Sequence, residues 1–374
     1  MKRRHAPTGE QTTEAKRRLP RFALVFYGIA AFGLIVYLIC LASVSFADFI
    51  NGSIGSAVRA VMAYLTGWIP FSLAEYLLLL VPLILVCLAV YGIRRYSDSW
   101  RDVFVYCGSM LSVGALVFGI FALGFAPAYR GASLDRKLGL ERRKVSAEEL
   151  YEVALILADQ LQIESDLVDY WEEDRFSVMP YGYGEMNDLL LEAYDTVCDE
   201  HAFVQRLNSR LKPVMLSEAM SYTHITGVYT FFTGEANINM AFPDYTIPYT
   251  AAHELSHQRG IAREDEANFM AFLVCIASED AYIRYCGYLN LYEYVASALY
   301  SASPTLYVQV SNRLPAEVRR EMSAFNDFFE KYRESTASEV SETVNNTFLT
   351  MHGTEGVKSY GMVVDLAVAY YLPS

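Results

Sequence analysis

The stretch His253-Glu254-Leu255-Ser256-His257 places two histidines four residues apart, with a glutamate directly after the first. Residues four apart lie one turn apart on the same face of an α-helix. Two imidazoles in that arrangement can bind one Zn²⁺, and the glutamate, about 100° around the helix, can reach a water molecule at the open metal position. The pattern predicts a zinc hydrolase site, with His253 and His257 as ligands and Glu254 as general base.

The residues around this stretch predict a short helix with defined ends. Pro248 is typical of the first turn of a helix, and Gly260 is typical of its end. A second helix is expected over residues 264–278. Its apolar run, residues 269–277, is too short to cross a bilayer. The stretch is therefore expected in a water-exposed domain and not inside a membrane.

A catalytic zinc ion needs a third protein ligand, and three acidic residues begin the second helix. They are Glu264, Asp265 and Glu266. We choose Glu264, because a carboxylate there shares a helix face with Asn268, one turn later. Asn268 could support a zinc-binding histidine through its free ring nitrogen, and Glu266 is a second candidate for a supporting role.

Hydrolysis of a peptide bond also needs a donor to the developing oxyanion. The candidates are His224, Tyr285, Tyr288, Tyr292 and Tyr360. We single out His224 and Tyr288, although the sequence does not choose among the five. If zinc is bound, Glu254 takes a proton from the attacking water and returns it to the leaving amine.

Three uncharged stretches near the N-terminus predict membrane-spanning helices, which need about 17–25 residues. They cover residues 22–47, 76–93 and 103–129. The first is too long for a signal peptide and has no clear cleavage site, so an uncleaved anchor is expected. The predicted organisation is a basic tail over residues 1–21, a membrane domain over residues 22–130 and a third part over residues 131–374.

Lysine and arginine predict the orientation. Seven of them precede residue 22, and Arg94, Arg95 and Arg101 lie between the second and third stretches, whereas Arg59 is alone between the first two. The positive-inside rule places the tail and the second loop in the cytoplasm and the chain after about residue 130 outside. We therefore expect a multi-pass protein of the cytoplasmic membrane, in contact with the lipid bilayer.

Residues 54–73 are apolar but contain Arg59 and Pro70. They predict a helix at the outer interface or part of a re-entrant turn, with a packed loop as an equal alternative. Residues 214–242 are rich in β-branched and aromatic residues and predict strands joined by turns, with residues 233–239 as an edge strand or turn. The chain from residue 248 onward is mostly helical. The predicted fold class is α+β, with three N-terminal transmembrane helices.

Composition excludes several classes of protein. The formal net charge of −13 argues against nucleic acid as a partner. The six cysteines form no CxxC pair, so neither a disulfide framework nor a cysteine-based zinc site is expected.

HExxH followed by an ExxAN pattern on a second helix resembles the gluzincin zinc metallopeptidases. Over nearly its full length, the chain looks like an uncharacterised bacterial family of membrane-anchored HExxH proteins, known as a domain of unknown function. The matching pieces are Ile69-Pro70-Phe71-Ser72, Arg136-Lys137-Leu138-Gly139-Leu140, Thr233-Gly234-Glu235-Ala236-Asn237, HELSHQRG from His253, EDEAN from Glu264, and Ser359-Tyr360-Gly361.

This resemblance implies a zincin-like fold for residues 131–374 and a zinc metalloendopeptidase that acts on peptides or proteins at the outer membrane face. In gluzincins, an edge strand beside the site pairs with the peptide substrate. Residues 234–239 would be that strand here. The resemblance thus assigns substrate contacts to Gly234, Glu235, Ala236 and Asn237.

Two departures from the gluzincin pattern matter. Only six residues separate His257 from Glu264, fewer than most gluzincins use, so Glu266 or Asp265 could be the ligand instead. Asn268 replaces the usual aspartate. The alternative function is a membrane-anchored binding or scaffold protein with a structural or inactive zinc site. Glu254 favours the enzyme, because a structural zinc site needs no base beside an open position.

Overall fold

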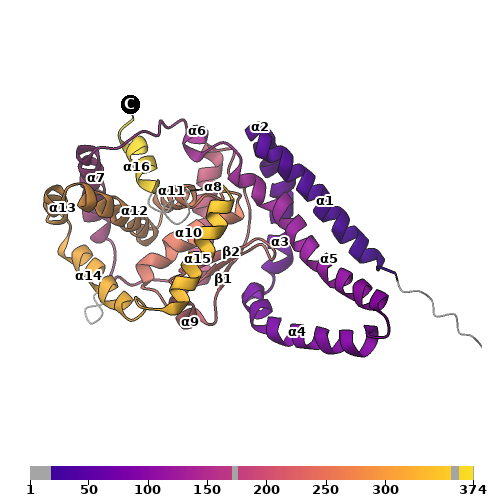
Figure 1. Cartoon of the computed structure of the whole chain (residues 1–374). Coiled ribbons are helices and arrows are strands. Elements are labelled where there is room, and N and C mark those ends of the chain that lie inside the picture. Colours follow the sequence, from indigo (N-terminus) through magenta and orange to yellow (C-terminus); the bar gives the residue numbers. More distant parts are fainter. Residues whose placement is uncertain (1–17, 171–175, 355–361, 374) are drawn as a thin grey trace, which may run out of the picture.

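The computed structural model describes residues 18–170, 176–354 and 362–373. Most of the predicted basic tail and Ser359-Tyr360-Gly361 lie outside the described residues. Figure 1 shows long helices on one side and a globular, mostly helical part with a small sheet on the other. The α+β prediction with three N-terminal apolar helices is confirmed.

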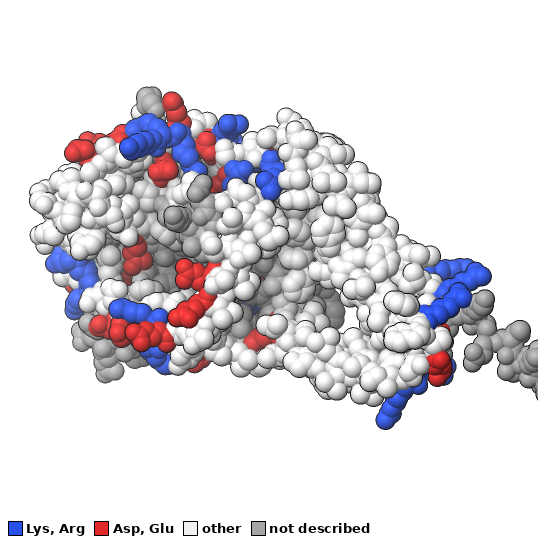
Figure 2. Space-filling model, viewed as in Figure 1, with Lys and Arg blue, Asp and Glu red and all other residues white. Residues whose placement is uncertain are grey.

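The three apolar helices are α1 (Arg21–Ala42), α4 (Leu73–Tyr96) and α5 (Trp100–Gly124). Each is long and apolar enough to cross a bilayer, which indicates association with a membrane. α1 packs along α5, whereas α4 diverges from α5 towards the globular part (Figure 1). In Figure 2, Lys and Arg gather at the far end of these helices, and uncharged surface covers most of their length.

The segment between α1 and α4 is helical. It consists of α2 (Val44–Ile50), a π-helical turn η1 (Asn51–Gly55) and α3 (Ser56–Gly67). For residues 54–73, a plain packed loop is therefore not what is observed, while the position of α3 relative to the outer interface stays a prediction. α3 packs one side against α5 and the sheet, and exposes Val61, Tyr64 and Leu65 on the other.

The globular part contains three strands and many helices. Its helices are η2 (Ala126–Tyr129), α6 (Leu134–Leu138), α7 (Ala147–Ser165), α8 (Tyr183–Glu200), α9 (Ser217–Ser221), η3 (Asp244–Thr246), α10 (Ile247–Gln258), α11 (Glu264–Ile276), α12 (Ala281–Ala302), α13 (Pro304–Ser311), α14 (Ala316–Glu330), α15 (Thr336–Met351) and α16 (Val363–Tyr371). α11 is buried almost all round, as its uninterrupted apolar run requires. It lies between α10 and α12 in the main core.

The sheet has the order β1-β3-β2. β3 (Glu235–Ile238) pairs in parallel with β1 (Leu211–Pro213) and antiparallel with β2 (Gly227–Thr230). The prediction that residues 233–239 form an edge strand or turn is therefore wrong, since β3 is central and its four residues are buried. The edge beside α10 is β2, because strand pairing is decided by contacts with a distant segment, β1.

Buried polar contacts join the globular part to the connector between α1 and α4. The Arg59 guanidinium of α3 donates to the carbonyl oxygen of Gly124 at the end of α5 (2.7 Å) and to Asn51 Oδ1 (2.8 Å). Asn51 Nδ2 in turn donates to the carbonyl oxygen of Gly260, after α10 (3.0 Å). The cation thus lies where the C-terminal ends of two helices present their carbonyl groups.

The sheet is tied to the start of α4 in the same way. Both carboxylate oxygens of Glu235 accept backbone N–H groups at the first turn of α4, from Leu73 (3.1 Å) and Ala74 (2.9 Å). The Lys212 ammonium on β1 donates to the carbonyl oxygens of Thr66 (3.0 Å) and Ile69. Separating the two parts would leave these buried charged groups without partners, so they form one structural unit.

We expect Glu235→Gln to lower the free energy of unfolding by about 1–3 kcal/mol, because an amide can accept at only one of the two positions and carries no charge. The measurement is the midpoint of thermal unfolding of the full chain in detergent. Glu279→Gln, the same change at an exposed position, is the control and should have little effect. Equal midpoints for the two variants would contradict the proposed stabilisation.

Candidate metal centre

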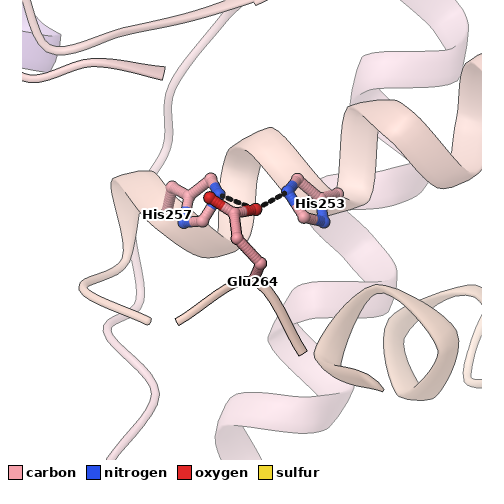
Figure 3. Close-up of side chains that lie close together, drawn as sticks. All are labelled: His253, His257 and Glu264. Atoms are coloured by element: carbon pink, nitrogen blue, oxygen red, sulfur yellow. Dashed lines mark ion pairs between the residues drawn. The ribbon is translucent and has the colours of Figure 1, made fainter. Parts of the chain in front are cut away.

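Three buried side chains from α10 and α11 meet at one point. His253 and His257 project from one face of α10, and Glu264 is the first residue of α11 (Figure 3). Glu264 Oε2 lies 3.2 Å from His253 Nε2 and 3.4 Å from His257 Nε2. One ligand atom from each residue lies within 4.8 Å of the other two. Two imidazoles and one carboxylate in this geometry are the protein ligands of many catalytic zinc sites.

The other two acidic residues point elsewhere. Asp265 pairs with Arg142 (2.5 Å). Glu266 Oε1 accepts the backbone N–H of Leu134 (3.0 Å) and a bond from Arg263 (2.9 Å). Glu266 therefore holds the first residue of α6. Among the three acidic candidates for a third ligand, the structure brings only Glu264 to the two histidines.

The short connection between α10 and α11 works because α10 ends in a tight left-handed turn. Gly260 has φ +85°, and its N–H donates to the carbonyl oxygen of His257. The N–H of Ile261 donates to the carbonyl oxygen of Ser256. This is the Schellman arrangement, which favours glycine. The turn reverses the chain at once, so six residues suffice to return Glu264 to the histidines.

The two histidine rings are held differently. His257 Nδ1 lies 2.8 Å from the carbonyl oxygen of Ile261, which fixes the proton on Nδ1 and leaves Nε2 free for a metal. His253 Nδ1 is buried without a hydrogen-bond partner among the described residues. Asn268 was expected to support one of the rings, but no hydrogen bond joins it to either; its side chain lines the neighbouring cavity instead.

Glu264 and His257 shift each other's pKa values in the directions that favour the charged forms. Burial would lower the pKa of His257, but the Glu264 carboxylate raises it to about 9. Burial would likewise raise the pKa of Glu264, yet the two imidazoles hold it well below its ordinary value. An ionised carboxylate between two buried imidazoles is a donor set that fits a divalent cation such as Zn²⁺.

Glu254 faces the cavity next to the cluster. Its Oε2 has no hydrogen-bond partner among the described residues, and the backbone N–H of Tyr229 on β2 is near enough to have a small lowering effect on the pKa of the carboxyl. Burial raises the pKa of Glu254 to about 6, against the opposing effect of the two histidines. A carboxylate with a pKa near neutrality can both accept and return a proton.

The cavity has a volume of about 450 Å³. It lies between α10, the start of β2, α12, α14 and α15, and Figure 2 shows the surface hollowed in this part of the molecule. α15 contributes polar side chains, Ser341, Glu342 and Asn345, to its wall. The cavity therefore connects Glu254 and His253 to the surface through a polar opening.

Of the two residues singled out as oxyanion donors, only His224 lines the cavity. Its Nε2, however, is bonded to the carbonyl oxygen of Tyr332 (2.7 Å). Tyr288 packs on Phe272, with ring centroids 5.9 Å apart, and is not among the residues that line the cavity. Tyr285 donates to Glu321 and Tyr292 is buried outside the cavity, while Tyr360 lies beyond the described residues.

Two tyrosines near the site were missed by sequence reasoning. Tyr294 lines the cavity, and burial together with the charges of Glu293 and Glu264 raises its pKa to about 12. Tyr129, directly after the third apolar helix, is close enough to Glu264 for that charge to add to the effect of burial in raising its pKa well above the ordinary value. No sequence signal distinguishes them from the other 26 tyrosines.

The residues predicted to bind substrate have structural contacts instead. Glu235 holds the start of α4, and Asn237 Nδ2 donates to the carbonyl oxygen of Val228 within the sheet (3.0 Å). The carbonyl oxygen of Gly234 accepts a bond from Gln258. None of the four residues 234–237 lines the cavity. Gly227, on β2, is the strand residue that approaches Glu254.

Fold and site together define an α+β protein with three apolar helices that indicate membrane association, and with a buried His-His-Glu cluster beside an open cavity. The chain belongs to the family described as "Protein of unknown function (DUF3810)", whose model matches residues 53–368. The matched region includes α3, α4, α5 and the whole cluster. No curated protein and no solved structure matches the chain significantly.

We expect Gly227→Ala to disturb Glu254. A Cβ atom at Gly227 would lie 2.7 Å from Glu254 Cγ and 2.8 Å from Thr250 Cγ2, closer than carbon atoms can approach. Overpacking of this kind costs about 1–3 kcal/mol. Thermal unfolding measures the loss, and Gly184→Ala on α8, where a Cβ meets nothing within 4 Å, is the matched control. A Gly227→Ala protein as stable as this control would argue against the close packing.

Proposed function

We propose that this protein is a membrane-anchored zinc metallopeptidase that hydrolyses peptide bonds, with His253, His257 and Glu264 as zinc ligands. The observation that carries the proposal is the convergence of these three ligands beside the unpartnered Glu254 oxygen, at the wall of an open cavity. A structural zinc site is usually closed by four protein ligands, whereas a catalytic one keeps a position for water. Three ligands and an adjacent base favour catalysis over the scaffold alternative.

Zinc, when bound, would polarise the substrate carbonyl and lower the pKa of a water molecule. Glu254 accepts the proton of that water and delivers it to the leaving amine, for which its pKa of about 6 is suited. Tyr294, which lines the same cavity, is the neutral donor that we assign to the developing oxyanion. It remains protonated at neutral pH because its pKa is raised to about 12.

The free edge of β2 would bind the peptide. The N–H of Asn239 donates to the carbonyl oxygen of Thr226, so in this antiparallel pair the backbone groups of Val228 also face β3. Those of Gly227 and Tyr229 therefore face outward, and the N–H of Tyr229 lies close enough to Glu254 to lower the pKa of its carboxyl slightly. An extended peptide that adds to this edge would lie across the metal ligands, as strand-adding substrates do.

The proposed location is the cytoplasmic membrane, with the N-terminus and the α4–α5 loop in the cytoplasm and the globular part outside. The ends of α1 and α5 and the start of α4 lie next to the globular part. Arg94, Arg95 and Arg101 lie at the opposite end, where the positive-inside rule expects them.

Zinc stoichiometry tests the ligand set. We expect the full chain, purified in detergent, to hold one zinc ion per molecule, and Glu264→Gln to weaken zinc affinity by at least about 10-fold, because a neutral amide is a poor ligand. Glu266→Gln, which can still accept from Leu134 and Arg263, should retain zinc. Loss of zinc from the Glu266 variant alone would move the site to the other carboxylate. Absence of zinc from the wild type would refute the proposal.

Glu254→Gln tests the reaction. This variant should keep its zinc but cleave peptides at least about 100-fold more slowly, because it cannot take a proton from water. The assay uses the full chain in liposomes with a mixture of synthetic peptides, and mass spectrometry identifies the products. Glu339→Gln, an exposed acid on α15, is the control and should cleave at the wild-type rate. Equal cleavage by the wild type and the Glu254 variant would rule out the mechanism.

A further inference from the structure

β2 runs from the proposed metal site towards the C-terminal end of α5, a predicted membrane-spanning helix. At its start, a Cβ atom on Gly227 would lie 2.7 Å from Glu254 Cγ. Phe231 follows β2 directly, at the start of the turn to β3, and its ring lies 5.0 Å from that of Phe121, in the last turn of α5. Even a fully extended chain covers at most about 13 Å in four residues. The Glu254 carboxylate is thus only a short distance from α5, a predicted membrane-spanning helix. The free edge of β2 extends along this distance.

Phe121 lies near the expected boundary of the bilayer. α5 has 25 residues, and the hydrocarbon core of a bilayer takes about 20. One turn before Phe121, Val117 and Phe118 are still 36 % and 40 % exposed. Phe121 itself packs on Phe231 and Phe348 of the globular part, and the turn after it is buried, mainly against α1 and the segment between α1 and α4. α5 therefore leaves the lipid at about Phe121, and the end of β2 lies at that level.

α15 borders the same region and has an unusual distribution of side chains. Its polar residues Ser341 and Asn345 face the cavity, while Val340 and Val344 are 61 % and 64 % exposed. A helix on a water-soluble domain normally has the opposite arrangement. Phe348, one turn after Val344 on the same stripe, packs on Phe121 with ring centroids 6.0 Å apart. The apolar stripe thus continues from α5 and is placed to contact lipid.

We propose that the substrates are membrane-anchored proteins, cut in the segment directly next to their own membrane span. This inference rests on the proposed peptidase function. A peptide paired with β2 and extending past Phe231 reaches the bilayer at once, so a chain that emerges from lipid there meets Glu254 after about four to ten residues. The reaction is hydrolysis: the C–N bond breaks, and water supplies the hydroxyl of the new carboxylate and the proton of the new amine.

The test compares three substrates that carry the same randomised 30-residue segment. In the first, the segment directly follows a single membrane span; in the second, a 60-residue Gly/Ser spacer separates them; the third is the free peptide. Full-chain protein and substrate are reconstituted in phosphatidylethanolamine/phosphatidylglycerol liposomes, and mass spectrometry maps the cuts. We expect cuts within about ten residues of the span and at least 10-fold faster cleavage of the first substrate than of the second. The spacer substrate controls for concentration at the membrane.

Val344→Glu tests the lipid contact separately, with Val344→Thr as a matched control of similar shape. The charged variant should slow cleavage of the first substrate and leave that of the free peptide unchanged. Cleavage that depends on Glu254 but is equally fast for the first two substrates would overturn this inference and keep the peptidase. Failure of all three substrates to show Glu254-dependent cleavage would refute both.

Discussion

The buried guanidinium of Arg59 is the contact on which the arrangement of the site depends. It is 2 % exposed, and no carboxylate of the described residues bonds to it. Its two terminal nitrogens donate to the carbonyl of Gly124, to Asn51 and, at longer range, to the carbonyl of Arg259. It therefore joins the C-terminal ends of α5 and α10, where helix dipoles favour a cation. α10 carries both histidines, so the segment between α1 and α4 positions one end of the candidate metal site.

The contacts of the sheet extend this constraint. Glu235 and Lys212 connect β3 and β1 to the start of α4 and the end of α3, so the sheet, α10 and the apolar helices share one frame. β2 is free only at its outer edge, because its inner edge is paired with β3. A strand that is held this firmly can present a backbone edge to a substrate without being reshaped by it. The contacts with the apolar helices are thus part of the geometry of the candidate site.

Features that depend on local spacing were predictable. The i, i+4 histidines, the end of α10 at Gly260 and the start of α11 at Glu264 all follow from helix geometry and were found where expected. Features that depend on long-range packing were not. Tyr288 and Tyr294 lie on different faces of α12, and packing of α12 against α7 and α10 decides that Tyr294 faces the cavity. The central position of β3 depends on pairing with β1, more than twenty residues earlier.

The sequence by itself determined three apolar helices, an α+β fold and a pair of histidines with a neighbouring glutamate, because the periodicity of a helix and the thickness of a bilayer act on adjacent residues. Only the tertiary structure decided that Glu264 and not Glu266 meets those histidines, that β2 is the open edge and that the membrane side secures α10. Such choices depend on contacts like that between Asn51 and Gly260, which are 209 residues apart. A local sequence pattern cannot predict a contact of that kind, since the contact forms only when the whole core has packed.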